Sequence, residues 1–182
     1  MLRFFDFAFS LVGIVCISPL LFVIFVLLLF DTGSPIFVQE RVGRYKKPFK
    51  LIKFRTMRKS TTSVASHLVD RNSITKIGIV LRKTKFDELP QLINVLKGDM
   101  SLVGPRPNLF NQETLIEERE RFNIYIVRPG ITGLAQIKNI DMSTPTEIAM
   151  LDYTMISELT VRKYFFYLIA TVLGKGFGDA VK

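Results

Sequence analysis

The chain has 182 residues, enough for one ordinary domain with a core of its own. Hydrophobic residues make up 48% of it and its formal net charge is +9, a combination that favours contact with something anionic, such as lipid head groups, nucleotide phosphates or nucleic acid. Because Cys16 is the only cysteine, the composition excludes an internal disulfide and a cysteine-based zinc site. His67 is the only histidine, which argues against a Ser-His-Asp triad or a His-rich metal site. Carboxylates, lysines or tyrosines are therefore left as the main acid-base groups.

An apolar segment without a charged residue occupies positions 7–30. Its 24 residues exceed the roughly 20 needed to cross a bilayer core, and neither its length nor its flanks fit a signal peptide. Ser18 and Pro19 divide it into halves of 12 residues, and a helix of that length reaches about midway through the core. A helix that enters and leaves on one face is therefore geometrically feasible, but the residues alone favour a straight or kinked spanning helix.

Basic residues are distributed asymmetrically about this segment. Only Arg3 precedes it, whereas 24 of the 25 Lys and Arg residues follow it, so the positive-inside rule predicts that the body of the protein is cytoplasmic. Nine of them, with no acid between them, lie at 41–59, where they either rest on anionic lipid head groups or in part bind a phosphate. Interleaved Phe and Tyr would also suit nucleic acid, but the adjacent membrane segment argues against that partner.

Beyond the membrane segment the sequence predicts a small β-hairpin followed by helices. Strands are expected at 36–38 and 49–54, a hairpin loop at 43–48, a Ser- and Thr-rich loop at 60–66, and the start of a helix at 74–81. A clearer helix opens at Asp87 and closes at Gly98, because acids in the first turn, a proline near the start and a glycine after the end fit the rules for helix termini. Further helices are predicted at 109–122, at 146–159 with Thr144 as its cap, and at 163–173, which lies in the membrane interface or packs in the core.

Asp87 and Glu88 are the leading candidates for chemistry. For an arbitrary protein, the default interpretation of two such acids is a helix cap. However, a carboxylate can hold Mg²⁺ beside a diphosphate or attack phosphorus to form an acyl-phosphate, and the nearby Arg82 suits phosphate oxygens. Two rigid turns add further candidates: prolines fix the backbone on both sides of Arg106, and a turn that starts at Arg128 carries glycines that let a ligand approach the backbone.

Taken in order, these segments resemble the bacterial sugar transferase family, the monotopic phosphoglycosyl transferases. The resemblance covers nearly the whole chain, and its longest run is highly specific. The matching stretches are QERVG at 39–43, KFRTM at 53–57, LRKT at 81–84, DELPQLINVLKGDMSLVGPRP at 87–107 and RPGITG at 128–133. The chain lacks the extra multi-helix membrane domain of larger relatives, so it looks like the minimal catalytic form.

The resemblance implies a fold that is mainly α with a small β-hairpin. It reverses the preference for a spanning helix, because in this family a Ser-Pro pair, here Ser18 and Pro19, breaks a re-entrant membrane helix. Residues 1–31 would form this helix, and residues 32–182 would form one membrane-associated catalytic domain with amphipathic interfacial helices around its active site. The family's location implies the bacterial inner membrane, with the active site on its cytoplasmic face.

The resemblance also implies an activity. The family aspartate that matches Asp87 attacks the β-phosphate of a UDP-sugar, UMP leaves, and a polyprenol phosphate such as undecaprenyl phosphate then collects the phosphosugar from the carboxylate. This transfer initiates a glycoconjugate, such as an O-antigen, a capsule, an exopolysaccharide or a glycoprotein glycan. It requires Mg²⁺ beside Asp87, and Glu88 assists with the metal or with proton transfer. The substrate-binding positions that match the family are Lys53, Arg82, Arg106, Pro107, Arg128 and Asp152.

The sequence departs from the family pattern at Leu134, where the family often has Trp, and at 137–145, which leaves the sugar open. Segments at 63–68, 141–145 and 174–179 look like those of a subgroup that handles N-acetylated 6-deoxyhexosamines. Two alternatives stay open: a non-catalytic membrane scaffold, and the same chemistry on a single-pass helix. The expected partners are the UDP-sugar, the polyprenyl phosphate and membrane lipids, without nucleic acid, and the oligomeric state is left open, a homodimer included.

Overall fold

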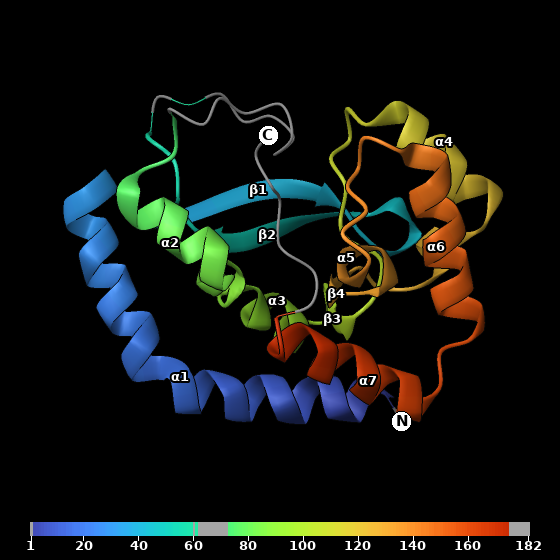
Figure 1. Cartoon of the computed structure of the whole chain (residues 1–182), viewed down its shortest axis with the longest axis horizontal. Helices are drawn as coiled ribbons and strands as arrows, with labels where there is room; N and C mark the ends of the chain where they lie inside the picture. The colour runs from blue at the N-terminus through green and yellow to red at the C-terminus, as the bar shows by residue number, and fades with distance from the viewer. Residues whose placement is uncertain (1, 60, 62–72, 175–182) are drawn as a thin grey trace.

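The computed structural model describes residues 2–59, 61 and 73–174. His67, nearly all of the loop predicted at 60–66, the whole segment at 63–68 and nearly all of that at 174–179 therefore lie outside the described residues. Within the described part, helices predominate over two small two-stranded sheets, and an apolar helix begins the chain (Figure 1). The prediction of a mainly α protein with a small β-hairpin is confirmed.

Helix α1 (Leu2–Thr32) contains the whole apolar segment and changes direction about midway along its length (Figure 1). Pro19 lies inside it, and the hydroxyl of Ser18 donates to the carbonyl of Val15 over 2.9 Å. A proline removes a backbone donor and crowds the preceding turn, which accounts for a bend. By length and composition α1 is apolar enough to cross a membrane, and its buried residues are only Asp6, Ser10, Ile24 and Leu28.

The predicted hairpin consists of β1 (Ile36–Val42) and β2 (Pro48–Phe54), which pair antiparallel from Ile36 opposite Phe54 to Val42 opposite Pro48. A short 3₁₀ turn, η1 (Arg44–Lys46), joins them. The first strand runs four residues beyond the predicted 36–38, because its pairing with β2 continues through a basic and acidic stretch that shows no apolar alternation. Phe54, at the end of β2, packs with Ile24 and Leu28 of α1.

The centre of the molecule contains the turn that carries the acid pair. It comprises α2 (Lys76–Thr84), the 3₁₀ turn η4 (Phe86–Glu88) and α3 (Gln91–Lys97). The predicted glycine terminus of α3 is confirmed, since Gly98 has a left-handed φ of 91°. Asp87 and Glu88 lie in η4, just before α3 rather than in its first turn as predicted, because the chain tightens into a 3₁₀ turn ahead of Pro90.

A second sheet pairs β3 (Ser101–Val103) and β4 (Gly130–Thr132) in parallel. The sequence predicted no strand at these positions, because strands of three residues are too short for an alternating pattern. The remaining elements are α4 (Glu113–Arg121), η5 (Ile124–Ile126), α5 (Leu134–Ile137), α6 (Pro145–Ser157) and α7 (Val161–Val172). Thr144 is the N-cap residue of α6, as predicted, but its side chain makes no cap hydrogen bond.

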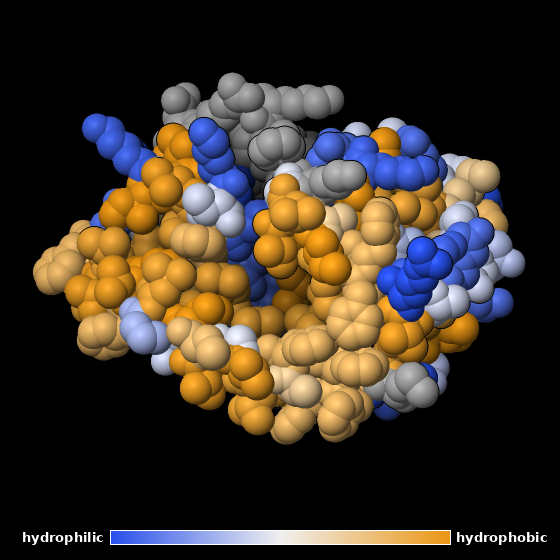
Figure 2. Space-filling model, turned by 60° about the horizontal axis from the view of Figure 1, so that its bottom comes forward, coloured by the Kyte–Doolittle hydropathy of each residue, from blue (hydrophilic) through white to orange (hydrophobic). Residues whose placement is uncertain are grey.

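One main core joins β2, α3, β3, α6 and α7, with Val95, Met100 and Tyr164 among its fully enclosed side chains. Helix α7 turns one face to this core and leaves Phe166, Ile169 and Val172 exposed. Figure 2 shows that the face formed by the lower part of Figure 1, where α1 and α7 run, is largely hydrophobic. Exposed apolar surface of this extent marks contact with a membrane or a partner.

Candidate active site

The acid pair sits in a turn that local sequence shapes on both sides. The hydroxyl of Thr75 caps the start of α2 by accepting from the backbone N–H of Gly78 over 2.9 Å. Helix α2 ends at Lys85, whose left-handed φ of 60° redirects the chain into η4. Asp87 is buried there, with 6% of its surface exposed, and Glu88 is partly exposed beside it. The two carboxylates therefore have different surroundings although they are neighbours in sequence.

Positive side chains from three separate segments converge on these acids. Lys53 comes from β2, Arg82 from α2 and Arg106 from the loop after β3. Arg106 forms an ion pair with Glu88, Nη2 to Oε1 at 3.0 Å. The Nε of Arg82 donates to the hydroxyl of Thr56 over 3.0 Å, while its buried Nη1 has no hydrogen-bond partner among the residues that the structure describes. A buried guanidinium nitrogen in this position is suited to an anionic oxygen of a ligand.

Burial dominates the electrostatics of Asp87. Loss of solvent raises the pKa of its carboxyl to about 7, and the charge of Glu88 raises this pKa as well, whereas Lys53, Arg82 and Arg106 lower it. Burial also lowers the pKa of the Lys85 ammonium, against the opposing charge of Glu88. A carboxylate with little solvation and a pKa near neutrality is a typical feature of a reactive group.

The loop that carries Arg106 is fixed by a close approach of two backbones. The N–H of Gly104 donates to the carbonyl of Thr132, and the N–H of Gly130 donates to the carbonyl of Pro105, both over 2.8 Å. A Cβ atom added to Gly130 would lie 2.0 Å from the nitrogen of Gly104, so no larger residue fits. The two turns that the sequence presented separately, around Arg106 and after Arg128, are therefore one structural unit.

Arg119 of α4 is a residue that the sequence interpretation missed. It is 2% exposed, and its Nη2 and Nε donate to Oδ2 of Asp152 over 2.7 and 3.0 Å. Its Nη1 donates to the carbonyl of Arg106 and to Oδ1 of Asn108, both over 2.9 Å. Asp152 of α6 is thus held by Arg119, which in turn fixes the Arg106 loop. The spacing of Leu115 and Arg119, four residues apart on the buried face of α4, was the available signal.

The other predicted positions are distributed around this centre. The carbonyl of Pro107 accepts from Nη1 of Arg41 over 3.1 Å. The Nε of Arg128 donates to the carbonyl of Gly98, at the end of α3, over 2.7 Å. Ser18 and Pro19 lie at the bend of α1 and are not among the residues that line the pocket described next.

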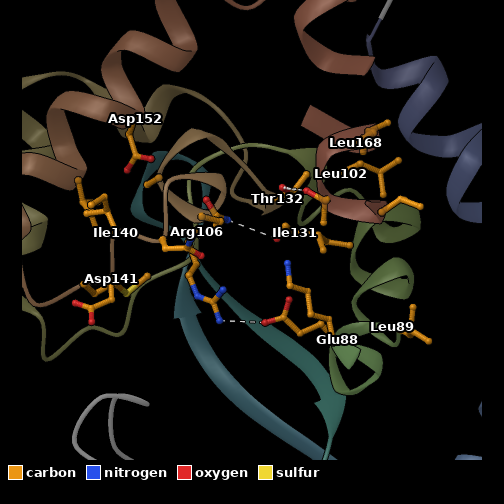
Figure 3. Close-up of a pocket in the computed structure, with 18 of the residues that line it drawn as sticks. Glu88, Leu89, Leu102, Arg106, Ile131, Thr132, Ile140, Asp141, Asp152 and Leu168 are labelled. Carbon is orange, nitrogen blue, oxygen red and sulfur yellow. Dashed lines mark hydrogen bonds and ion pairs between the residues drawn. The ribbon is translucent and has the colours of Figure 1, made fainter. Parts of the chain in front are cut away.

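A pocket of about 480 Å³ opens beside the acid pair. Glu88 and Arg106 line it, whereas Lys53, Arg82 and Asp87 do not. In Figure 3, Leu89, Leu102 and Leu168 lie on one side of the ion pair between Arg106 and Glu88. Ile140, Asp141 and Asp152 lie on the opposite side (Figure 3). The pocket therefore combines an apolar wall, a more polar wall and a charged edge, which suits a ligand that is itself part polar and part apolar.

A metal site made of protein ligands alone is absent from the described residues, because they contain no cluster of three or more His, Cys, Asp or Glu side chains. Mg²⁺ commonly uses only one or two carboxylates and takes its other ligands from water and substrate phosphates. Asp87 and Glu88 provide that number of carboxylates, so the donor set fits Mg²⁺ together with a bound diphosphate.

The burial of Asp87 predicts an unusual dependence of stability on pH. Between the ordinary pKa of 3.8 and the raised value of about 7, the folded protein keeps a proton that the unfolded chain has released, so the free energy of unfolding falls as pH rises through this window. Asp87→Asn should remove this fall in the free energy of unfolding, and the variant should therefore be more stable than the wild type above neutral pH. Thermal melts in metal-free detergent solution at about pH 5 and about pH 8 measure it, with the exposed Asp31→Asn as control. Identical pH dependence of the wild type and Asp87→Asn would contradict the prediction.

The buried ion pair of Arg119 and Asp152 predicts that truncation of the Asp152 side chain strongly lowers the stability of the fold. Asp152→Ala leaves a buried guanidinium without its carboxylate and should cost about 3–5 kcal/mol of stability. Lys163 and Glu158 form a matched exposed ion pair, and Glu158→Ala should cost at most about 1 kcal/mol. Denaturant or thermal unfolding of both variants checks the contrast, and equal costs would show that burial does not govern the pair.

Comparison with known proteins connects this geometry to a family. The family model for bacterial sugar transferases matches residues 1–175. The chain is 43% identical over 136 residues to the uncharacterized sugar transferase EpsL of Bacillus subtilis, an alignment that covers 74% of this chain and 67% of EpsL. It is 40% identical over 136 residues to the UDP-N-acetylgalactosamine-undecaprenyl-phosphate N-acetylgalactosaminephosphotransferase of Aeromonas hydrophila, covering 70% of this chain and 31% of that protein.

A third relative is the UDP-glucose:undecaprenyl-phosphate glucose-1-phosphate transferase of Caulobacter vibrioides, 42% identical over 118 residues that make up 63% of this chain and 44% of that protein. The chain thus spans two thirds of EpsL but less than half of the other two relatives. The family match covers nearly all of the sequence, and the resemblance found in the motifs is confirmed. The chain belongs to the bacterial sugar transferase family.

Proposed function

We propose that this chain transfers a sugar-1-phosphate from a UDP-sugar to a polyprenol phosphate and releases UMP. The observation that carries the proposal is the buried carboxylate of Asp87 within the influence of Lys53, Arg82 and Arg106, beside a pocket with an apolar wall. The names of the Aeromonas and Caulobacter relatives, which specify undecaprenyl phosphate as acceptor, support the same class of acceptor for this chain.

The reaction proceeds in two displacements. A carboxylate oxygen of Asp87 attacks the β-phosphorus of the donor, the bond from this phosphorus to the bridging oxygen breaks, and UMP leaves with the electron pair. A phosphate oxygen of the acceptor lipid then attacks the same phosphorus, which releases the carboxylate and gives a polyprenyl diphosphate sugar. Low solvation of Asp87 favours attack, because a buried carboxylate needs to lose little water before it reacts.

The surrounding cations supply the electrostatic part of the mechanism. Lys53, Arg82 and Arg106 stand where charge builds up on the phosphate oxygens, and fixed positive groups stabilise such charge without reorganisation. The Nη1 of Arg82, which has no hydrogen-bond partner within the described residues, would donate to a phosphate oxygen. Asp87 and Glu88 would hold Mg²⁺, which when bound neutralises charge on the diphosphate. Arg128 and Asp152 act more indirectly in this scheme, through the end of α3 and through Arg119.

The membrane topology is part of the proposal. We infer that α1 enters and leaves the bilayer on the cytoplasmic face of the bacterial inner membrane, because its bend at Pro19 divides it into two arms that each pack against the catalytic body. A straight spanning helix could not keep Leu2 and Phe5 against the main core while Ile24 and Leu28 pack against β2 and α2. The apolar surface of α7 would rest on the same interface.

The identity of the transferred sugar is also part of the proposal. The two relatives named above act on different sugars by name, N-acetylgalactosamine and glucose, so similarity alone does not choose between them. We propose an N-acetylated 6-deoxyhexosamine, for which the apolar side chains of Ile140, Met142 and Ile148 would accommodate methyl groups. The product would initiate a glycoconjugate.

The nucleophile predicts a clear kinetic result. Asp87→Asn should abolish both UMP release and the covalent phosphosugar adduct, which wild-type protein should form with the correct UDP-sugar before any lipid acceptor is added. A panel of UDP-sugars assayed for UMP, with intact-mass measurement of the protein, checks it. The exposed Asp31→Asn serves as the matched control and should behave as wild type. Normal turnover by Asp87→Asn would rule out the assignment, and a wild type that consumes no UDP-sugar would favour the scaffold alternative.

The topology predicts where the N-terminus lies. A cysteine introduced ahead of α1 in a Cys16→Ser background should react with a membrane-impermeant thiol reagent only from the cytoplasmic side of sealed vesicles. In a second variant, Lys138→Cys places the thiol at an exposed position of the catalytic body and marks the cytoplasmic side. Reaction of the N-terminal cysteine from the opposite side would establish a single-pass helix instead.

A further inference from the structure

A charged pair lies at the beginning of the apolar helix, outside the chemistry described so far. Arg3 and Asp6 are one turn apart in α1, with Nη1 of Arg3 3.7 Å from Oδ2 of Asp6. Asp6 is only 3% exposed, although most of the helix presents its side chains outward. A buried carboxylate is costly unless hydrogen bonds and opposite charge satisfy it, so its contacts indicate what it is for.

Asp6 binds the start of β3 and the first turn of α7. The hydroxyl of Ser101 donates to the Asp6 carboxylate over 2.9 Å, and the N–H of Leu102 donates to Oδ1 over 2.9 Å. The hydroxyl of Tyr164 donates to Oδ1 over 2.8 Å. Burial and the neighbouring carboxylate both raise the pKa of the Tyr164 phenol, which keeps it protonated as a donor. Three donors from two elements therefore converge on one carboxylate of the membrane helix.

Arg3 binds the end of α3. Its Nη2 donates to the carbonyl of Val95 over 2.6 Å and to that of Leu96 over 3.4 Å, and its Nη1 donates to the carbonyl of Met100 over 3.2 Å. The last carbonyls of a helix have no partner within it and carry partial negative charge, so an arginine there satisfies them and opposes the helix dipole.

The contacts with α3 and β3 lie on the two elements that flank the active site. Helix α3 follows directly from the turn with Asp87 and Glu88, and Arg3 holds its far end. Strand β3 leads into the loop with Arg106, and Asp6 holds its first two residues. The distance between Glu88 and Arg106 depends on how these two elements are placed relative to each other, and the Arg3/Asp6 pair touches both.

We propose that Asp6, together with Arg3, is a positioning residue that couples the seating of the membrane helix to the geometry of the active site. When α1 is docked, the pair fixes the end of α3 against the start of β3 and so sets Arg106 against Glu88. Release of the pair would leave the chemistry-bearing side chains present but misplaced. The kinetic consequence rests on the proposed function, whereas the structural consequence does not.

A control for substitution of Asp6 is available at Ser10 of α1. Ser10 is one turn beyond Asp6 on the buried face of α1, is fully enclosed, and its hydroxyl has no hydrogen-bond partner within the described part of the chain. Ser10→Ala therefore perturbs the same contact surface without removing a bond to β3, α3 or α7. Asp6→Asn, in contrast, keeps the size of the side chain but removes its charge. It also replaces one carboxylate oxygen with an NH₂ group, which cannot accept the hydrogen bonds that Asp6 accepts.

Two measurements on the full-length chain in lipid nanodiscs test the proposal. Hydrogen exchange should accelerate in Asp6→Asn at 101–107 and spare the β1 and β2 hairpin, while Ser10→Ala matches wild type. UMP release from a donor that the wild type consumes, measured well below the melting temperature, should fall roughly ten- to a hundredfold in Asp6→Asn, the size expected for misplaced catalytic groups. In an Arg106→Lys background the same change should cost far less, because Asp6 acts through that loop.

The outcomes separate the two hypotheses. Unchanged exchange at 101–107, wild-type UMP release by Asp6→Asn, or an equal fold loss in the wild-type and Arg106→Lys backgrounds would each overturn the positioning role and leave the proposed function intact. A wild type that releases no UMP, with faster exchange at 101–107 in Asp6→Asn, would overturn the proposed function and support the coupling of α1 to this loop. If Asp6→Asn does not fold, Tyr164→Phe removes one of the same hydrogen bonds and should give the same pattern with a smaller amplitude.

Discussion

Burial of the Asp87 carboxylate requires nearby positive charge, because a desolvated anion has lost the water that would otherwise stabilise it. No single element supplies that charge: Lys53 belongs to β2, Arg82 to α2 and Arg106 to the loop after β3. The hairpin, the α2 to α3 turn and the β3 loop must therefore meet at one point. Much of the architecture can be understood as the scaffold that brings these three segments to the acid pair.

Two sets of contacts fix the loop that carries Arg106. The close contact of Gly104 with Gly130 ties the Arg106 loop to β4, and Arg119 ties the same loop to Asp152 of α6. These contacts fix the position of the Arg106 side chain, since the backbone of its loop is held from both sides. The pocket beside the ion pair of Arg106 and Glu88 is accordingly lined by several elements, and its shape depends on all of them.

Helix α1 packs against the rest of the described chain along both of its arms. Its second arm packs Ile24 and Leu28 against β2 and α2, and its first arm places Arg3 and Asp6 on α3 and β3. An apolar surface along α1 and α7 remains open on the same face of the molecule (Figure 2). For the proposed reaction, this arrangement would bring a lipid-soluble acceptor and a water-soluble donor to one site.

Local chemistry let the sequence determine the apolar helix, the β-hairpin and the glycine end of α3, because helix termini and apolar runs are encoded by neighbouring residues; it also singled out Asp87 and Glu88 as candidates for chemistry. The parallel pairing of β3 with β4, the clamp of Arg119 and the contacts of Asp6 join residues about 30 to 160 positions apart. No local pattern encodes such contacts, since they arise only when the core closes and buried polar groups must find partners. The tertiary structure alone decided which basic side chains lie near Asp87 and that Arg3 and Asp6 of α1 bind α3, β3 and α7.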